Sequence, residues 1–408
     1  MTAPETGEIM AMAAGDGIDI EKVRLDTPGC ASVAHLNNAG AALPPAPVLD
    51  AVTEHLRLEA RTGGYEANDL ARELTEGFYD AVAGLVGAHR DEIAYVENAT
   101  RAWDMAFYAV PFAAGDRILT TTSEYASNAI AFHQVAKARG VSVEVLPDDG
   151  DGQLSLDALA AELARGRVRL VAINHVPTHN GLVNPAAEVG RLCRETGVLF
   201  LLDACQSVGQ LAVDVGEIGC DMLSTTGRKF LRGPRGTGFL YVRRDLLREL
   251  EPPFLDLHSA VWTAPDRYEI RDDARRFETW ERYVAGQIGL GVAAGYAAAL
   301  GVRAIEERVT GLAARLREEL AATPGVTVLD RGARRCGIVT FTVAGRESAE
   351  MKGVLRERGI NVSVTDHTHQ RLDPNAVPAA VRASAHYYNT DEELGLLVSA
   401  VRELAPRR

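Results

Sequence analysis

Lysine is scarce in this chain of 408 residues, because the 43 basic residues include only four lysines: Lys22, Lys137, Lys229 and Lys352. Acidic residues outnumber basic ones by 56 to 43, which gives a net charge of −13. A surface of this sign repels nucleic acids and anionic membranes, so we expect neither as a partner. Because lysine is so scarce, any lysine beside an apolar strand is a candidate functional group.

Cysteine and long apolar runs are also sparse. Five cysteines without a CxxC pair fit reduced thiols rather than a disulfide or zinc framework. The longest apolar runs, such as 198–202, fall far short of the ~20 residues that a membrane span requires. Residues 1–20 contain no Lys or Arg and so lack the basic region of a secretory signal. We expect a cytoplasmic protein with an N-terminal tail over residues 1–25.

From about residue 44 to residue 243, helix-period segments alternate with short apolar runs, which is typical of a parallel sheet covered by helices. The apolarity of these runs is continuous, which indicates strands buried on both faces. The predicted strands are 93–96, 117–120, 141–146, 168–173, 198–202, 221–226 and 238–242.

A second unit follows an Ala-rich stretch, 285–320, that predicts a long helix or a helix pair. Beyond it, strands are predicted at 337–343 and 381–385, and helices at 348–358 and 391–404. These elements fit a smaller α+β domain. We therefore predict a tail over 1–25, a large domain over 26–284 and a small domain over 285–408.

Ligands of open α/β sheets bind where strands end and helices begin. Asp203 follows the apolar run 198–202, and a carboxylate buried there needs a compensating partner. A helix cap or an ion pair with an arginine explains this residue as well as a catalytic role does. Lys229 lies 26 residues further on, between a predicted strand and a glycine-rich turn. Partial burial would lower its pKa and free the amine for a Schiff base, although a single lysine is more often a solvated surface group.

Two further junctions follow the strands 93–96 and 117–120. Residues 98–101 form a small polar turn before a helix, which suits a phosphate through free N–H groups, or serves only as a helix cap. Tyr125 places an aromatic ring where it could stack on a flat cofactor or merely pack.

Other motifs exclude alternatives. Residues 233–238 read GxxGxG and precede a strand, so they fail the dinucleotide-binding pattern. His175 and His179 are separated by Pro177, which argues against a shared helix face for zinc. His367 and His369 lie in a predicted loop, and we predict no metal site.

A phosphate pocket, a stacking ring, a buried carboxylate and a Schiff-base lysine together describe a site for pyridoxal 5'-phosphate (PLP). The ordered motifs resemble the class V aminotransferase family of fold type I PLP enzymes, which includes cysteine desulfurases. Within it, the chain looks most like the branch of isopenicillin N epimerase-like proteins and carbon–sulfur lyases of S-substituted cysteines. The motifs are 98–100, 123–125, 178–181, 203–206 and 226–229 for the family, and 63–65, 228–236 and 277–281 for the branch.

The resemblance implies an α/β fold, with a mainly parallel seven-stranded sheet between helices and a smaller C-terminal α+β domain. It also implies a homodimer with shared active sites. Lys229 would hold PLP and shuttle the substrate's α-proton, Asp203 would keep the ring nitrogen protonated, and Tyr125 would stack on the ring. The remaining implied contacts are Gln206 and Thr178 for the phenolate oxygen, Ala99, Thr100, Thr226 and Arg228 for the phosphate, Arg382 for the substrate carboxylate, and Asn38 and Tyr65 for the substrate pocket.

The chain departs from the desulfurase pattern in three places, one of which is the region around Glu281, where the phosphate contact that the partner chain donates in desulfurases has no clear match. Desulfurases carry a catalytic cysteine in the small-domain loop before the carboxylate-binding arginine, and the matching stretch 362–369 has none. Tyr125 stands where desulfurases usually have a histidine. We therefore expect β-elimination from an S-substituted cysteine with release of a thiol or sulfenate. Transamination, epimerisation and decarboxylation use the same residues and remain alternatives, whereas a non-catalytic binding module would not need Asp203, Lys229 and Arg382 together.

Overall fold

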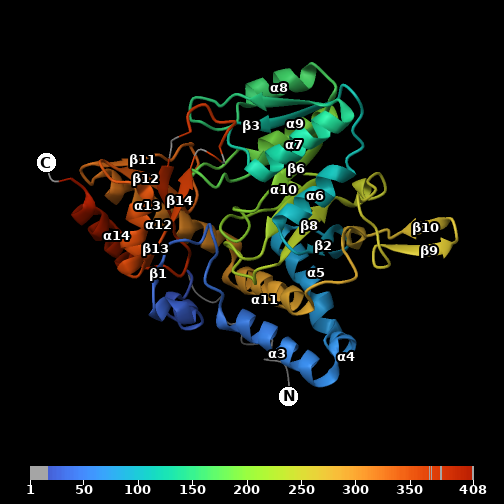
Figure 1. Ribbon diagram of the computed structural model, residues 1–408, viewed down its shortest axis with the longest axis horizontal. Coiled ribbons are helices and arrows are strands. Elements are labelled where there is room, and N and C mark those ends of the chain that lie inside the picture. Colours follow the sequence, from blue (N-terminus) through green and yellow to red (C-terminus); the bar gives the residue numbers. More distant parts are fainter. Residues whose placement is uncertain (1–16, 367, 369, 377–378, 407–408) are drawn as a thin grey trace.

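A computed structural model describes residues 17–366, 368, 370–376 and 379–406. Its larger unit is built on a seven-stranded sheet in the order β2-β8-β7-β6-β5-β3-β4 (Figure 1). Neighbouring strands from β7 to β4 are parallel, and β8 runs antiparallel to both of its neighbours. The predicted fold class is thus confirmed. The strands are β2 (Ile93–Val96), β3 (Arg117–Thr121), β4 (Ser142–Leu146), β5 (Val168–Asn174), β6 (Leu199–Asp203), β7 (Met222–Thr226) and β8 (Gly238–Val242).

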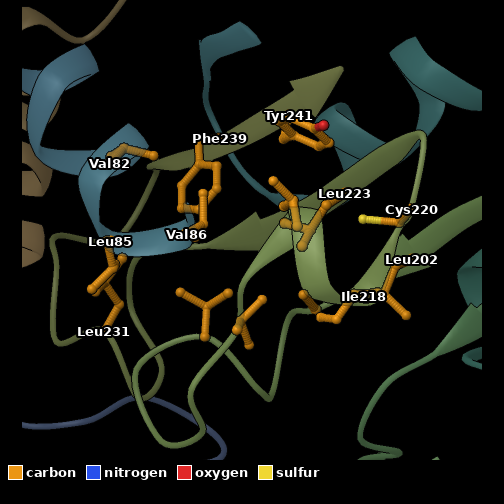
Figure 2. Packing of buried hydrophobic residues seen from close by; sticks show 14 of the residues in the cluster. Val82, Leu85, Val86, Leu202, Ile218, Cys220, Leu223, Leu231, Phe239 and Tyr241 are labelled. Carbon is orange, nitrogen blue, oxygen red and sulfur yellow. The ribbon is translucent and has the colours of Figure 1, made fainter. Parts of the chain in front are cut away.

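Both faces of the inner strands of this sheet are buried, as the continuous apolar runs predicted, but the edge strand β4 is mostly exposed or half-buried. On β6, Phe200 and Leu202 join one apolar cluster, whereas Leu201 joins a second cluster on the opposite face. Figure 2 shows part of the first cluster, where Leu202, Leu223 and neighbouring side chains pack. In the inner strands both sets of alternating side chains are therefore removed from water, which stabilises the sheet by burial of apolar area.

The helices of the larger unit divide between these two faces. Residues of α6 and α7 pack in the second cluster, and residues of α5, α8, α9 and α11 pack in the first. The helices of this unit are α3 (Ala46–Thr62), α4 (Gly64–Leu70), α5 (Arg72–Val86), α6 (Ala99–Ala109), α7 (Ala126–Arg139), α8 (Leu156–Ala164), α9 (Ala186–Thr196), α10 (Val215–Ile218) and α11 (Val284–Leu300), with short 3₁₀ turns at Arg90–Glu92, Arg244–Leu246 and Ala274–Phe277.

The C-terminal unit has its own four-stranded antiparallel sheet in the order β11-β12-β15-β14. Its apolar cluster fills the space between this sheet and three helices. The elements are β11 (Val326–Val328), β12 (Ile338–Val343), β14 (Ser363–Asp366), β15 (Ala379–Ser384), α12 (Val302–Ala321), α13 (Ser348–Glu357) and α14 (Asp391–Leu404). The predicted strands and helices of this α+β unit agree with these bounds to within two residues.

The Ala-rich stretch forms a helix pair. Gly301, with φ +84°, separates α11 from α12, and the two axes are bent by 81°. No single helix in the described part of the chain is long and apolar enough to cross a membrane; α11 and α12 pass such a test only as a bent pair, and most of α11 is buried in the protein. A hairpin of β9 (Ala260–Ala264) and β10 (Arg267–Ile270), absent from the sequence prediction, projects from the larger unit (Figure 1).

The N-terminal segment joins the C-terminal unit. Strand β1 (Ala34–His35) pairs in parallel with β13 (Ile360–Asn361). Before it come α2 (Ile20–Leu25) and the 3₁₀ turn Pro28–Ala31, and Arg24 forms an ion pair of 2.8 Å with Glu393 on α14. The domain boundaries at residues 25 and 284 stay a prediction.

Candidate active site

A cavity of about 460 Å³ lies at the carboxyl ends of the central strands, where the sequence predicted a ligand site. Its walls come from the segments that follow β2, β3, β5, β6 and β7. The lining residues are Asn98, Ala99, Thr100, Ser123, Tyr125, Asn128, Asn174, Val176, Thr178, His179, Asp203, Cys205, Gln206, Thr226, Arg228 and Lys229. All nine residues predicted to bind the cofactor are therefore brought together.

Asp203 is the last residue of β6 and is buried between β5 and β7. Its Oδ1 accepts a hydrogen bond of 2.9 Å from the Cys205 N–H, and its Oδ2 accepts one of 3.0 Å from Asn128 Nδ2. Burial raises the pKa of Asp203, and these hydrogen bonds and the nearby Lys229 oppose the rise. Within the described residues no arginine pairs with Asp203, so the arginine explanation for its burial does not hold.

Lys229 lies half-buried on the turn after β7. Its Nζ donates a hydrogen bond of 3.3 Å to the Sγ of Cys205. Burial raises the pKa of the Cys205 thiol although Lys229 opposes the effect, so the thiol stays protonated at neutral pH. Lys229 and Asp203 thus line the same cavity, and the charge of Lys229 acts on Asp203.

The N-terminus of α6 forms another wall of the cavity. Ala99 and Thr100 begin the helix, and the Asn98 side chain caps it by accepting a hydrogen bond of 2.9 Å from the Arg101 N–H. Free N–H groups in a first helical turn favour an anion. Thr226 and Arg228 also line this cavity, although the Thr226 hydroxyl donates to Thr237 O and Arg228 Nη1 to Gly40 O.

Gly238 lets this anion-binding turn approach the sheet. A Cβ at this first residue of β8 would lie 2.5 Å from the Thr225 carbonyl oxygen and 3.1 Å from the Asn98 carbonyl carbon. Contacts of this length with backbone atoms force the chain to shift. Only glycine therefore allows β8 to pass so close to the start of α6.

Thr178 connects the predicted cofactor and substrate contacts. Its hydroxyl accepts a hydrogen bond of 3.0 Å from Gln206 Nε2 and another from Arg382 Nη1. Arg382, on β15 of the C-terminal unit, also donates to the Thr178 carbonyl at 3.1 Å. The two units of the fold therefore meet beside the cavity.

Arg382 is 8% exposed and forms no ion pair with any carboxylate in the described part of the chain. Its Nε and the Oε1 of Gln206 are buried without a hydrogen-bond partner. Burial, together with the charge of Arg228, lowers the pKa of Arg382 to about 10. A buried guanidinium in this state gains free energy when an anion binds.

Tyr125 is positioned as expected, and two other predicted residues are not at the cavity. Tyr125 immediately precedes α7, lines the cavity and is 41% exposed. Asn38 is buried, but it bonds to Ser384 O, Asn389 and Tyr388 and does not line the cavity. Tyr65 lies on α4 and is 73% exposed, outside the cavity. A substrate role for Asn38 and Tyr65 stays a prediction.

The two described histidines considered for metal binding have different surroundings. Burial lowers the pKa of His175 to about 3, so its ring is neutral, and His179 Nδ1 lies 3.0 Å from Thr365 Oγ1. His367 and His369 lie outside the described residues. Elsewhere, across residues 17–366, 368, 370–376 and 379–406, no group of three or more His, Cys, Asp or Glu side chains is arranged to hold a metal ion.

Two buried residues were missed as functional candidates: Asn128, which lines the cavity, and Glu124, which is hydrogen-bonded to it. Glu124 belongs to the motif 123–125 but was given no role, and Asn128 was not considered. Asn128 Nδ2 donates to Glu124 Oε1 at 2.9 Å as well as to Asp203. Glu124 lies on the turn before α7 and Asn128 in its first turn, so no helical periodicity links them in the sequence.

Comparisons with known proteins identify the family of this chain. Residues 34–397 match the family "Aminotransferase class-V". A probable cysteine desulfurase of Methanothermobacter thermautotrophicus is 31% identical, over 94% of this chain and 98% of the relative. The apo structure of a cysteine desulfurase from Thermococcus onnurineus NA1 has a TM-score of 0.87 and 28% identity, over 94% of this chain and 98% of the other.

A third relative is the cystine C–S lyase C-DES, solved in complex with its reaction product cysteine persulfide. Its TM-score is 0.83 and its identity 25%, over 93% of this chain and all of the lyase chain. A structure of a C-DES mutant, in which one lysine is replaced by alanine, carries glycine covalently linked to PLP.

The residues of the cavity fit PLP. Lys229 would hold the cofactor covalently, Asp203 would meet its ring nitrogen, and the first turn of α6 would bind its phosphate, while the unpartnered Oε1 of Gln206 shows that the side-chain amide is not fully satisfied by the protein. The chain therefore belongs to the class V aminotransferase family and is a PLP-dependent enzyme.

Proposed function

We propose that this enzyme is a carbon–sulfur lyase that releases a thiol or sulfenate by β-elimination from an S-substituted cysteine. The observation that carries the proposal is an intact cofactor cavity without a catalytic cysteine in the small unit beside Arg382. The stretch 362–366, which matches the position of the desulfurase nucleophile, contains no cysteine, and its residues 363–366 form strand β14.

None of the five cysteines replaces that nucleophile. Cys193, Cys220 and Cys336 are buried, and Cys30 is half-buried outside the cavity. Cys205 lines the cavity, but its thiol contacts Lys229 on the cofactor side and its pKa is raised by burial. A sulfur-accepting nucleophile needs a thiolate, so transfer to an enzyme persulfide is disfavoured. The similarity to a cystine C–S lyase supports elimination instead.

Arg382 supports an amino-acid substrate. Its buried, unpaired guanidinium suits bidentate binding of an α-carboxylate. The substrate would then lie between Arg382 and Lys229. The amine of Lys229 would take up the α-proton. PLP, when bound, supplies the electron sink that makes the α-proton acidic. The balanced reaction converts one S-substituted cysteine and one water into one thiol, one pyruvate and one ammonium ion.

A product assay tests the proposal. The purified, PLP-loaded enzyme is incubated with cysteine S-conjugates, with cystine and with cysteine, and pyruvate, thiol and alanine are quantified. We expect pyruvate and thiol in equal amounts from the conjugates. Alanine without pyruvate would indicate desulfuration, and a stable pyridoxamine form without pyruvate would indicate transamination. Inversion or decarboxylation of the substrate without thiol release would also contradict elimination.

We further propose that the chain acts as a homodimer in the cytoplasm. Large apolar side chains on α3, α4 and α5 are exposed, among them Leu49 at 51%, Leu70 at 69% and Leu74 at 54%. Neighbouring exposed apolar residues favour a protein interface. Light scattering coupled to gel filtration should give twice the chain mass of 43.8 kDa; a mass of one chain at micromolar concentration would contradict this proposal. Membership in the epimerase-like branch also remains a proposal.

A further inference from the structure

A second buried carboxylate lies behind Asp203. Glu124, on the turn between β3 and α7, is 2% exposed, and Asn128, in the first turns of α7, is 3% exposed. The Nδ2 of Asn128 lies 2.9 Å from Glu124 Oε1 and 3.0 Å from Asp203 Oδ2. Because an amide nitrogen carries two hydrogens, Asn128 can donate one to each carboxylate at the same time.

Protein donors otherwise surround Glu124. The Tyr125 N–H donates to Oε1 at 2.7 Å, and the Thr120 hydroxyl donates to Oε2 at 2.8 Å. Among the described residues no lysine or arginine forms an ion pair with Glu124, and Asp203 is the charged group that acts on it across Asn128. Burial and, next, the charge of Asp203 raise the pKa of Glu124 to about 7.

Two neighbouring carboxylates in a buried site repel each other, so the arrangement is costly until a positive charge arrives. The protonated ring nitrogen of PLP would supply that charge at Asp203. Lys229 also acts on the charge of Asp203, and its Nζ donates a hydrogen bond to Cys205 Sγ. The protonation states of Glu124 and of the ring nitrogen are therefore coupled, because a negative charge on Glu124 favours a positive charge on the nitrogen, and the reverse.

We propose that Glu124 and Asn128 are positioning residues for the cofactor: Asn128 orients the Asp203 carboxylate, and Glu124 adds a second negative charge behind it that keeps the ring nitrogen protonated. Neither residue touches the reacting atoms. The inference concerns the cofactor alone, so it holds whichever substrate the enzyme uses and can fail independently of the proposed lyase activity.

The test uses the holoenzyme loaded with PLP labelled with ¹⁵N in the ring. The Glu124→Gln variant keeps the size of the side chain and removes its charge. NMR of the labelled nitrogen, followed over pH, reports its protonation directly. We expect the pH midpoint for loss of the ring proton to fall by about one unit and the Kd of PLP to rise about tenfold, since one pKa unit corresponds to a tenfold change in an equilibrium constant.

Glu278→Gln is the matched control. Glu278 is also a buried carboxylate, 2% exposed, that accepts hydrogen bonds from Tyr79 and from the Tyr95 N–H, and it does not line the cavity. This variant should leave both the nitrogen midpoint and the PLP affinity unchanged. A midpoint in Glu124→Gln equal to that of the parent enzyme overturns the proposal, as does an equal shift in the control.

Asn128→Ala provides a second test that keeps both carboxylates and removes the link between them. We expect its ring-nitrogen midpoint and PLP affinity to change in the same direction as in Glu124→Gln. If Glu124→Gln does not fold, Asn128→Ala decides, and an unchanged nitrogen signal in that folded variant overturns the proposal.

Discussion

Lys229 is the side chain on which covalent attachment of the cofactor depends. Substitution Lys229→Ala should abolish the visible absorbance of the covalently held cofactor and make PLP removable by dialysis, because no other lysine lines the described cavity. Absorbance spectra before and after dialysis check this. Lys137→Ala, an exposed position on α7, should keep the parent spectrum. A visible band retained in Lys229→Ala would refute the assignment.

Arg382 should act mainly on substrate affinity. Arg382→Gln removes the buried charge, and we expect KM to rise roughly 100-fold, whereas Arg382→Lys keeps a charge without the planar fork and should raise KM about tenfold. Steady-state kinetics with one cysteine S-conjugate measures both. Arg303→Gln, on the exposed side of α12, serves as the control. Equal KM values in the parent and Arg382→Gln would contradict carboxylate binding.

The raised pKa of Glu124 predicts a pH-dependent stability of the apoprotein. The folded carboxyl holds its proton up to about pH 7, whereas the unfolded one releases it near 4.5. Between these values the folded state binds more protons, so the free energy of unfolding falls as pH rises, by at most about 3 kcal/mol. Urea unfolding at pH 5 and 7.5 should therefore show a larger decrease in the free energy of unfolding in the parent than in Glu124→Gln. Parallel losses would contradict the raised pKa.

The sequence indicated Lys229 and Asp203 because each follows a buried strand, a relation written in the local order of residues. It did not indicate Asn128, because the contact between α7 and β6 joins positions 75 apart and depends on how the helix lies on the sheet. The sequence also did not show that Arg382 is buried without a counter-ion, since this depends on the three-dimensional structure. Residue identity was predictable, and the hydrogen-bond network was not.

Among the elements, β8 approaches the start of α6 closely because residue 238 is a glycine. Gly238→Ala should shift the Asn98 turn and lower the free energy of unfolding by about 1–3 kcal/mol, with weaker PLP binding. Gly77→Ala, inside α5 with open space at its Cβ, should instead raise stability by about 0.5–1 kcal/mol. Denaturant unfolding and PLP titration of both variants check this, and equal behaviour of the two would contradict the steric argument.

Element bounds were predicted best where apolarity was continuous. The runs 93–96 and 238–242 are strands β2 and β8 with the same bounds. The β9–β10 hairpin escaped prediction because its residues are mostly exposed, so no buried pattern marks it. The turn at Gly301 was left open because an Ala-rich stretch has high helix propensity on both sides of it.

At the scale of the molecule, Arg232 joins three distant segments. It is 1% exposed and donates to Leu43 O at 2.8 Å and to the Tyr387 hydroxyl at 2.9 Å, and its guanidinium lies 4.7 Å from the centre of the Tyr388 ring. No carboxylate in the described residues pairs with it. Its position, three residues after Lys229, places the N-terminal segment, the cofactor turn and the C-terminal unit in one cluster.

We expect Arg232→Met to lower the free energy of unfolding by about 3 kcal/mol, because hydrogen bonds and cation–π contacts of a desolvated guanidinium are lost together. Guanidinium chloride unfolding measures the change. Arg191→Met removes only an exposed ion pair with Glu195 and should change stability by less than about 0.5 kcal/mol. Equal losses in the two variants would show that the Arg232 cluster does not join the units.

The pairing of β1 with β13 sets an order of events during synthesis. Ala34 is translated more than 300 residues before its partner Ile360. At ~5–20 residues per second, the N-terminal segment waits for at least about 15 seconds without its strand partner. The larger sheet, whose strands lie within residues 93–242, can assemble during that wait. The segment that carries β1 thus pairs late, after the strands of the larger sheet have been translated.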